Sequence, residues 1–208
     1  MIEPLDFHDL LRRRRSRRAF TAREIEPEKV ERALTAAMRA PSGANSQPWE
    51  YVLIERGPIR EKIRDACLKA DRDFHERSPE WLREFFKAHE ITPVKQFTEL
   101  APMLVAVFGR RDHPFWLQSV WLSVASFVYA LEVEGLHSLL YTPSLTKEFN
   151  RLIGVEEELS CQAVIPVGYA DPDEKITDRP RKSPAEKVRV VGPDGDIRPY
   201  KKTLPFDP

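Results

Sequence analysis

The stretch Ala40-Pro41-Ser42-Gly43-Ala44-Asn45-Ser46-Gln47-Pro48-Trp49 marks the point where a helix gives way to a strand. Before it, apolar side chains recur at helical spacing over residues 30–38, behind a proline at position 27 that suits a first helical turn. Because the residue before a proline avoids helical backbone angles, this helix is expected to stop at Ala40. After it, residues 49–54 are predicted to form a strand.

Outward from this junction, helices and strands follow one another irregularly. Helices are expected from Pro58, over Trp116–Val133 with a stop at Gly135, and over Ser144–Ile153; strands are expected over Met103–Phe108, His137–Tyr141 and Ala163–Tyr169. This irregular order predicts an α+β fold rather than a doubly wound sheet. We expect a single domain over residues 1–208, with a helical lid excursion at 71–100 and an extended tail at 170–208.

Composition limits the partners of this chain. Its 208 residues carry 33 Lys and Arg against 33 Asp and Glu, so no overall charge favours nucleic acid or an anionic membrane. The apolar stretch at 116–133 is short for a membrane span of about 20 residues, which favours a buried central helix that lies partly in a subunit interface. The N-terminus lacks the basic and apolar regions of a signal peptide, so the cytoplasm is the expected compartment.

The two cysteines, Cys67 and Cys161, are far apart and follow neither a disulfide framework nor metal-ligand spacing. Each has apolar neighbours, so both are expected to be reduced and buried, and no metal site is predicted. The glycine-rich motifs of dinucleotide folds and P-loops are missing from the sequence as well, which disfavours both kinds of phosphate site.

Six arginines stand in the seven positions from Arg12 to Arg18, interrupted by Ser16. Guanidinium groups bind phosphate bidentately and a serine hydroxyl adds a neutral donor, so the run is a candidate anion site. Composition alone leaves two alternatives open, which are a solvated basic face near a helix C-terminus and a nucleic-acid patch.

Two further segments could contact a flat ligand. The small residues of the Pro41–Trp49 loop allow close approach, and Asn45 and Gln47 offer amide groups to a ring edge; an ordinary helix-to-strand loop is the alternative. The Tyr141–Leu145 stretch is expected to open a helix. The free amides of that helix could bind an anion, or Thr142 or Ser144 simply caps it.

Together these segments resemble the FMN-dependent nitroreductase superfamily. The shared motifs are Arg14-Arg15-Ser16-Arg17-Arg18-Ala19-Phe20, the Ala40–Trp49 loop, Gly135-Leu136 with Thr142-Pro143, and Pro166-Val167-Gly168-Tyr169, in the same order over nearly the whole chain. The resemblance implies a mixed central sheet flanked by helices. It also implies an intertwined homodimer with FMN at the subunit interface and the long helix in the dimer contact.

The resemblance further implies roles for individual residues. Arg14, Arg15 and Ser16 would grip the FMN phosphate, and Arg18 would reach the flavin pyrimidine edge, where a cation raises the potential of the flavin. The other expected cofactor-binding residues are Pro41, Ser42, Gly43, Asn45, Gln47, Thr142, Pro143, Ser144 and Arg181. The loop residues would come from the partner subunit, Thr142 would lie near the flavin N5, and Arg181 is either a phosphate ligand or a solvated tail charge. Arg12, Arg13 and Arg17 are expected to be surface charge, and no side chain is predicted to be a catalytic acid or base.

Two segments, Lys95–Pro102 and Asp178–Lys182, resemble the iodotyrosine deiodinase-like branch more narrowly. In that branch a lid carries a Glu, a Tyr and a Lys that clamp the substrate amino acid. Lys95 matches the lysine, but the tyrosine position falls at Phe74 and the glutamate position near Ala70. The expected substrate lid, Phe74, Trp81 and Lys95, therefore suits a flat apolar or aromatic oxidant better than an amino acid.

The first functional hypothesis is an FMN-dependent NAD(P)H oxidoreductase. It would reduce a nitroaromatic, a quinone or a similar flat acceptor in a ping-pong scheme. Reductive dehalogenation of the iodotyrosine deiodinase type and flavin storage without turnover are the alternatives. A small-molecule substrate is expected, neither nucleic acid nor a membrane is an expected partner, and the choice between NADH and NADPH stays open.

Overall fold

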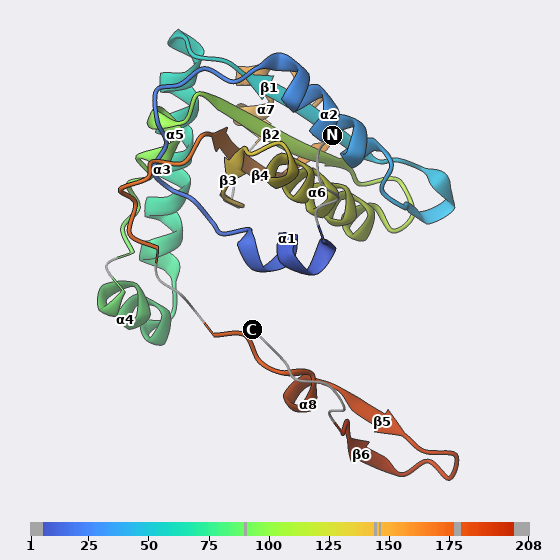
Figure 1. The fold of residues 1–208 in the computed structure, drawn as a ribbon. Coiled ribbons are helices and arrows are strands. Elements are labelled where there is room, and N and C mark those ends of the chain that lie inside the picture. Colours follow the sequence, from blue (N-terminus) through green and yellow to red (C-terminus); the bar gives the residue numbers. More distant parts are fainter. Residues whose placement is uncertain (1–5, 90, 144, 146, 177–179, 202–208) are drawn as a thin grey trace. The chain divides into compact units, whose positions relative to one another are not determined.

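The computed structural model describes residues 6–89, 91–143, 145, 147–176 and 180–201 (Figure 1). The chain forms two compact units, Met1–Glu174 and Lys175–Pro208. The first unit holds the central sheet and most of the helices. The expectation of a single domain over residues 1–208 stays a prediction.

A four-stranded sheet forms the centre of the first unit. Its strands are β1 (Trp49–Ile54), β2 (Met103–Arg110), β3 (His137–Ser138) and β4 (Leu159–Gly168), in the order β1-β2-β4-β3. All three pairs of neighbouring strands are antiparallel, whereas a mixed sheet is expected from the sequence. Among the described residues, the sheet gains parallel pairing through an isolated bridge between Ser16 and Ser138, at the edge formed by β3. The α+β class is confirmed.

Helices cover both faces of this sheet. One face is covered by α2 (Pro27–Met38) and α6 (Trp116–Val133), which lie side by side (Figure 1). Both helices pack against side chains that include Val105 and Val107 of β2. On the other face, α3 (Pro58–Arg77) and α7 (Lys147–Ile153) pack against the intervening residues Leu104, Ala106 and Phe108. Because successive residues of a strand point to opposite faces, the continuous apolar run in β2 marks a central strand, as predicted.

The long helix α6 has one buried and one open face. Val120, Val124, Phe127 and Leu131 are buried against the sheet and α2, while Leu117, Leu122 and Val133 are exposed. The helix stops as predicted, with Gly135 in the left-handed region at a φ of 72°. Among the described residues α6 is the one helix whose length and composition would allow a membrane crossing, and 39% of it is buried inside the chain. Its buried face gives it the place of a core helix in this unit.

Several local features differ from the expectations. Within the described residues α7 begins at Lys147 rather than at position 144, and β3 is only two residues long, with Tyr141 joining β4 through an isolated bridge. In α3 the apolar Ile59 is exposed, whereas its charged neighbour Arg60 is buried because its guanidinium donates to backbone carbonyls. Both cysteines are free, and Cys161 is half-buried rather than buried.

The segment expected to form a lid is helical. The tail, which is expected to be extended, contains a short helix and a hairpin. Beyond α3, the helices α4 (Glu80–Ala88) and α5 (Phe97–Leu100) carry the chain to β2, and α4 has no buried residue. In the second unit, helix α8 (Pro184–Lys187) leads into an antiparallel hairpin of β5 (Arg189–Val191) and β6 (Ile197–Pro199). The hairpin turns through Gly195, which has a φ of 82°, so the tail has local structure that its proline and charge content did not indicate.

Candidate functional site

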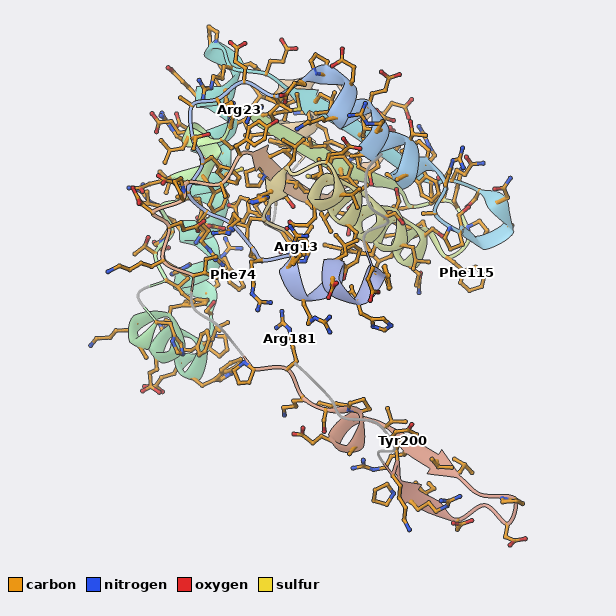
Figure 2. The ribbon with its side chains drawn as sticks, viewed as in Figure 1. Arg13, Arg23, Phe74, Phe115, Arg181 and Tyr200 are labelled. Atoms are coloured by element: carbon orange, nitrogen blue, oxygen red, sulfur yellow. The ribbon has the colours of Figure 1, made fainter. Side chains whose placement is uncertain are left out.

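The arginine segment begins where helix α1 (Phe7–Arg13) ends, and Figure 2 shows Arg13 at that end. Arg14 leaves the helix in an extended conformation, and the chain then runs along the sheet edge beside β3. Ser16 bridges Ser138, and the Arg17 N–H donates to the Ser138 carbonyl over 3.1 Å. Because these contacts are made by the backbone, they fix the course of the segment whatever side chains it carries.

Exposure divides the arginine run. Arg12 and Arg13 are exposed, as expected, and Arg12 pairs with Asp9 one turn earlier. Arg14 and Arg15 are half-buried, and no carboxylate of the described residues lies within ion-pair distance of Arg14. A partly buried guanidinium without an internal counterion is suited to an anionic ligand, because its donors remain available in a fixed fork.

Arg17 and Arg18 depart from the expected division. Arg17 is half-buried, and its guanidinium lies 3.7 Å from the carboxylate of Glu174, so its assignment as surface charge is wrong. The side chain of Arg18 is exposed, while its backbone N–H donates to Glu174 over 2.7 Å. The reason is non-local, since Glu174 comes from the far end of the same unit and closes over the segment.

The late Pro-Val-Gly-Tyr motif anchors the continuation of the arginine segment. The Thr21 N–H donates to the Tyr169 carbonyl over 2.9 Å, and Lys29 donates to the Tyr169 hydroxyl over 2.8 Å. The guanidinium of Arg23 lies 3.8 Å above the centre of the Tyr169 ring. The Tyr169 hydroxyl donates to Glu26, and this bond is the main cause that lowers the pKa of Glu26 to about 2. Tyr169 therefore ties the N-terminal segment to the end of β4.

The Thr142-Pro143 turn reaches the same edge of the sheet. It follows Tyr141, which bridges Val164 of β4, only a few residues after the Ser138 that contacts the arginine segment. Thr142 is exposed and Pro143 is buried, and Ser144 lies outside the described residues. The structure thus brings the arginine segment and the Thr142-Pro143 turn to one edge of the sheet. The helix after the turn begins later than expected.

The Pro41–Gln47 loop carries unusual backbone strain. Ala44, Asn45 and Gln47 have positive φ angles of 51°, 53° and 43°, a region that residues other than glycine rarely adopt. The loop is bonded to itself, because the Gln47 N–H donates to the Ser42 hydroxyl over 3.1 Å and the Gln47 amide donates to the Asn45 carbonyl over 3.3 Å. Backbone strain of this kind concentrates at ligand sites, so the loop is a functional candidate on structural grounds as well.

Packing against Phe115 requires a glycine at position 43. Its N–H donates to the Ser119 hydroxyl of α6 over 3.1 Å. A Cβ at this position would lie 2.6 Å from the ring of Phe115, which is 68% exposed and itself left-handed at a φ of 53°. The glycine therefore lets Phe115 lie against the loop, a role that does not depend on any ligand.

The loop and the arginine segment lie at opposite ends of the sheet, and Figure 2 shows Phe115, beside the loop, well apart from Arg13. Trp49, two residues after the loop, pairs with Gly109 at one end of β2. Ser138, beside the arginine segment, pairs with Val167, which in turn pairs with Met103 at the other end of β2. The six steps between those positions of β2 correspond to about 20 Å of strand. One copy of the chain therefore does not bring the Pro41–Gln47 loop to the edge where the arginine segment and the Thr142-Pro143 turn meet.

Arg60 holds the base of the lid. It is 5% exposed, and its guanidinium donates to the carbonyls of Thr98, Ala101 and Pro102 at the end of α5, over 3.0 Å to Thr98 and 3.2 Å to Pro102. Burial lowers the pKa of Arg60 to about 10. The cation also meets the negative end of a helix, so it fixes the point where the lid returns to β2.

The three predicted lid residues have different surroundings. Phe74 and Trp81 are 49% and 68% exposed, and the ring of Phe74 lies 5.9 Å from that of Phe86. Lys95 is turned inward, with its ammonium 3.3 Å from the carboxylate of Asp71 on α3. The structure thus brings Lys95 to the helix that carries Phe74.

Three residues of the site region were not predicted from the sequence. Asp71 directly follows the position where a lid carboxylate is expected, and helical periodicity could have placed it on the buried face. Ser138 acts through its backbone, which leaves no side-chain signal. Phe115 stands after a proline in front of the long apolar helix, and its left-handed backbone has no clear signal in the sequence.

Arg181, the tail residue expected at the phosphate, belongs to the second unit and has an exposed side chain (Figure 2). Its contact with FMN stays a prediction.

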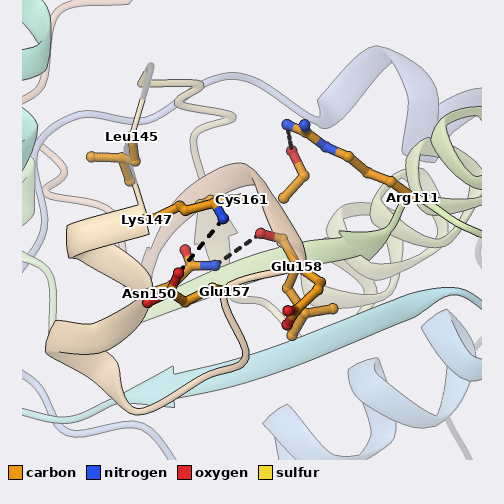
Figure 3. A pocket seen from close by; sticks show the side chains of 9 residues that line it. Arg111, Leu145, Lys147, Asn150, Glu157, Glu158 and Cys161 are labelled. Carbon is orange, nitrogen blue, oxygen red and sulfur yellow. Dashed lines mark hydrogen bonds and ion pairs between the residues drawn. The ribbon is translucent and has the colours of Figure 1, made fainter.

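A cavity of about 260 Å³ lies between α7 and β4 (Figure 3). Its lining includes Arg111, Lys147, Asn150 and Cys161. The polar groups are largely paired, since the amide of Asn150 donates to the carbonyls of Glu156 and Leu159 and Arg111 donates to a serine hydroxyl. None of the predicted cofactor-binding residues lines this cavity, so it is distinct from the candidate site. No group of His, Cys, Asp or Glu among the described residues is arranged to hold a metal ion.

The order of elements and the motif placements agree with one protein family. The model of the nitroreductase family matches residues 11–169 of this chain, from the arginine run to the tyrosine that anchors it. The chain belongs to the nitroreductase family. A relative from Thermotoga neapolitana, described as an iodotyrosine deiodinase, is 34% identical over 164 residues, which cover 79% of this chain and 88% of the relative.

Solved structures of the nitroreductase family have the same fold. A structure of oxidised iodotyrosine deiodinase bound to FMN and 3-iodo-L-tyrosine is 32% identical, with a TM-score of 0.78, and the match covers 85% of this chain and 96% of that one. A nitroreductase with bound FMN from Bacteroides fragilis NCTC 9343 is 18% identical, with a TM-score of 0.70, over 91% of this chain and 100% of the other. The predicted nitroreductase-like fold is confirmed.

Proposed function

We propose that this nitroreductase-family chain binds FMN as a homodimer and reduces small, flat aromatic acceptors with electrons from NADH or NADPH. One observation carries the proposal, namely that backbone pairing with Ser138 brings the half-buried arginine segment to the sheet edge that also holds Thr142-Pro143. The relative of known structure that is 32% identical binds FMN, which supports the same cofactor here.

The residues at this edge fit the chemistry of FMN. Arg14, Arg15 and Ser16 offer the charged and neutral donors that a phosphate monoester needs, and the exposed Arg18 has the length to reach a ring edge. Thr142, Pro143 and Ser144 would lie near N5, and Arg181 is proposed as a further ligand of the phosphate. When bound, FMN would supply two-electron transfer between a nicotinamide and the acceptor. The side chains of this edge would bind and orient the flavin, and we assign none of them a role as an acid or base.

The separation of the loop from the arginine segment supports a dimer. A second copy would supply Pro41, Ser42, Gly43, Asn45 and Gln47 to the site, and the loop is strained and largely exposed in a single chain. The open face of α6, with Leu117, Leu122 and Val133, and the exposed Phe7 and Leu11 of α1 provide apolar surface for such a contact. We propose in addition that the protein is cytoplasmic and that neither nucleic acid nor a membrane is a partner.

Reductive dehalogenation is the second candidate. The relatives that are 34% and 32% identical are described as iodotyrosine deiodinases, and Lys95 stands where their branch carries a lid lysine. Phe74 and Ala70 lack the polar groups of that lid, which favours a simpler aromatic acceptor over a halotyrosine.

Purification provides the first test of this proposal. The protein should be yellow, and the flavin released by denaturation should co-elute with FMN in chromatography. Anaerobic addition of NADH or NADPH should bleach the flavin, and a nitroarene or quinone should restore its colour. A colourless protein that takes up no added FMN would refute the proposal, whereas flavin that no donor bleaches would favour storage.

A further inference from the structure

Asp71 and Lys95 form a charge pair beneath the lid. The ammonium of Lys95 lies 3.3 Å from Asp71 Oδ2, and the two side chains are 20% and 10% exposed. The ammonium also donates to the carbonyl of Thr92 in its own turn. Asp71 Oδ2 is shielded from solvent and accepts no hydrogen bond from the described residues, so Lys95 is the charge that compensates it.

Asp71 lies on a different face of α3 from the positions at which a lid carboxylate and a lid tyrosine are expected. The iodotyrosine deiodinase-like branch would place a lid carboxylate near Ala70 and a tyrosine at Phe74, four residues apart and therefore on one helix face. In this chain that face is apolar and partly open, since Phe74 is 49% exposed. Asp71 is one residue further on, about 100° around the helix, and is buried. The acid thus stands on the buried side of α3 and holds Lys95 there.

We propose that Asp71 determines the specificity of the lid: by neutralising Lys95 it makes the site select aromatic acceptors without a carboxylate, such as halogenated phenols, nitroarenes and quinones, over aromatic amino acids. This inference rests on the proposed function and narrows its substrate class.

The burial of Asp71 makes it unfavourable for Lys95 to pair with a carboxylate on a ligand instead. To pair with a carboxylate on a ligand, Lys95 would have to leave Asp71, and a shielded carboxylate without a counterion is costly. If Lys95 stays, the ligand carboxylate meets a pair that is already neutral and gains little attraction. A neutral ring disturbs neither charge and can stack on the exposed ring of Phe74.

The test compares two probes that differ only in the amino-acid group. 3-Iodo-L-tyrosine and 2-iodophenol are titrated into the FMN-loaded protein, and binding is followed by the change in flavin absorbance. The wild-type protein should bind 2-iodophenol more tightly. Asp71→Asn keeps the side-chain volume but frees Lys95, so it should tighten 3-iodo-L-tyrosine by about tenfold, or ~1.4 kcal/mol, and change 2-iodophenol by less than about twofold.

Asp73→Asn is the matched control. It removes the same charge from the same helix, but the side chain of Asp73 is 42% exposed and pairs with Lys69 at the surface. The ratio of the two dissociation constants should not change in this variant. An equal shift in both variants would show a general charge effect and overturn the inference.

Other outcomes are equally decisive. Tighter wild-type binding of 3-iodo-L-tyrosine, no response to 2-iodophenol, or an unchanged ratio in Asp71→Asn contradicts the inference while leaving FMN binding intact. A chain that takes up no flavin overturns the proposed function and the inference together. A wild-type ratio that favours 3-iodo-L-tyrosine overturns the inference without any variant, so the inference can be refuted even if Asp71→Asn does not fold.

Discussion

The two sides of the candidate site are held by different kinds of contact. The arginine segment is joined to the sheet by its backbone, through Ser138 and, further along, through Tyr169. The lid is joined by side chains, through the three carbonyl bonds of Arg60 and the pair of Lys95 with Asp71, and α4 beyond them has no buried residue. A segment fixed by its backbone does not need the Arg14 side chain for its anchoring, whereas a lid fixed by side chains is expected to loosen when one of them is replaced.

The largest expected effect concerns the backbone-fixed side. Replacing Arg14 and Arg15 together by alanine should weaken FMN binding about a thousandfold, since two charge-assisted contacts at roughly 2 kcal/mol each are lost. The free energy of unfolding of the flavin-free protein should change much less than the FMN affinity, because the backbone contacts remain. Fluorescence titration of FMN and urea unfolding measure the two quantities.

The matched control is the double replacement of the exposed Arg12 and Arg13 by alanine. It removes the same charge from the same run and should leave FMN affinity within about threefold. Equal losses in the two double variants would mean that the run attracts FMN only through its overall charge.

The next effect concerns the side-chain-fixed lid. Arg60→Met should lower the free energy of unfolding by about 3 kcal/mol, because buried carbonyls at the end of α5 lose their donors. Arg56→Met is the comparison, since Arg56 is exposed and donates a single 3.3 Å bond to the Leu100 carbonyl. Urea unfolding should show a loss below about 0.5 kcal/mol for Arg56→Met, and similar losses in both variants would show that Arg60 does not anchor the lid.

The smallest effect concerns the anchor at Tyr169. The pKa of Glu26 is lowered from 4.5 to about 2 in the folded protein, chiefly by the hydrogen bond from the Tyr169 hydroxyl. Its contribution to stability is therefore present above pH 4.5 and is lost as the pH falls toward 2. Tyr169→Phe should lower the urea midpoint slightly at pH 5, and the difference from wild type should shrink at pH 3. A difference that does not depend on pH would assign the loss to packing.

The same contrast explains what could be predicted from the sequence. Local patterns predicted the α+β class, the long helix with its stop at Gly135 and the central strand at 103–108, because periodicity and glycine positions act over a few residues. Non-local side-chain contacts left no such pattern. The closure of Glu174 over Arg17 and the pairing of Asp71 with Lys95 join residues that are distant in sequence, and the hairpin of the tail was hidden by its proline and charge content.

The distance between the loop and the arginine segment has a genetic consequence. In the proposed dimer, each site takes its arginines from one copy and its loop from the other. A copy with damaged arginines and a copy with a damaged loop would each be inactive alone. In a mixed dimer, one site would carry both lesions and the other would carry neither. Two defective alleles could therefore complement each other, which two lesions within the arginine segment could not do.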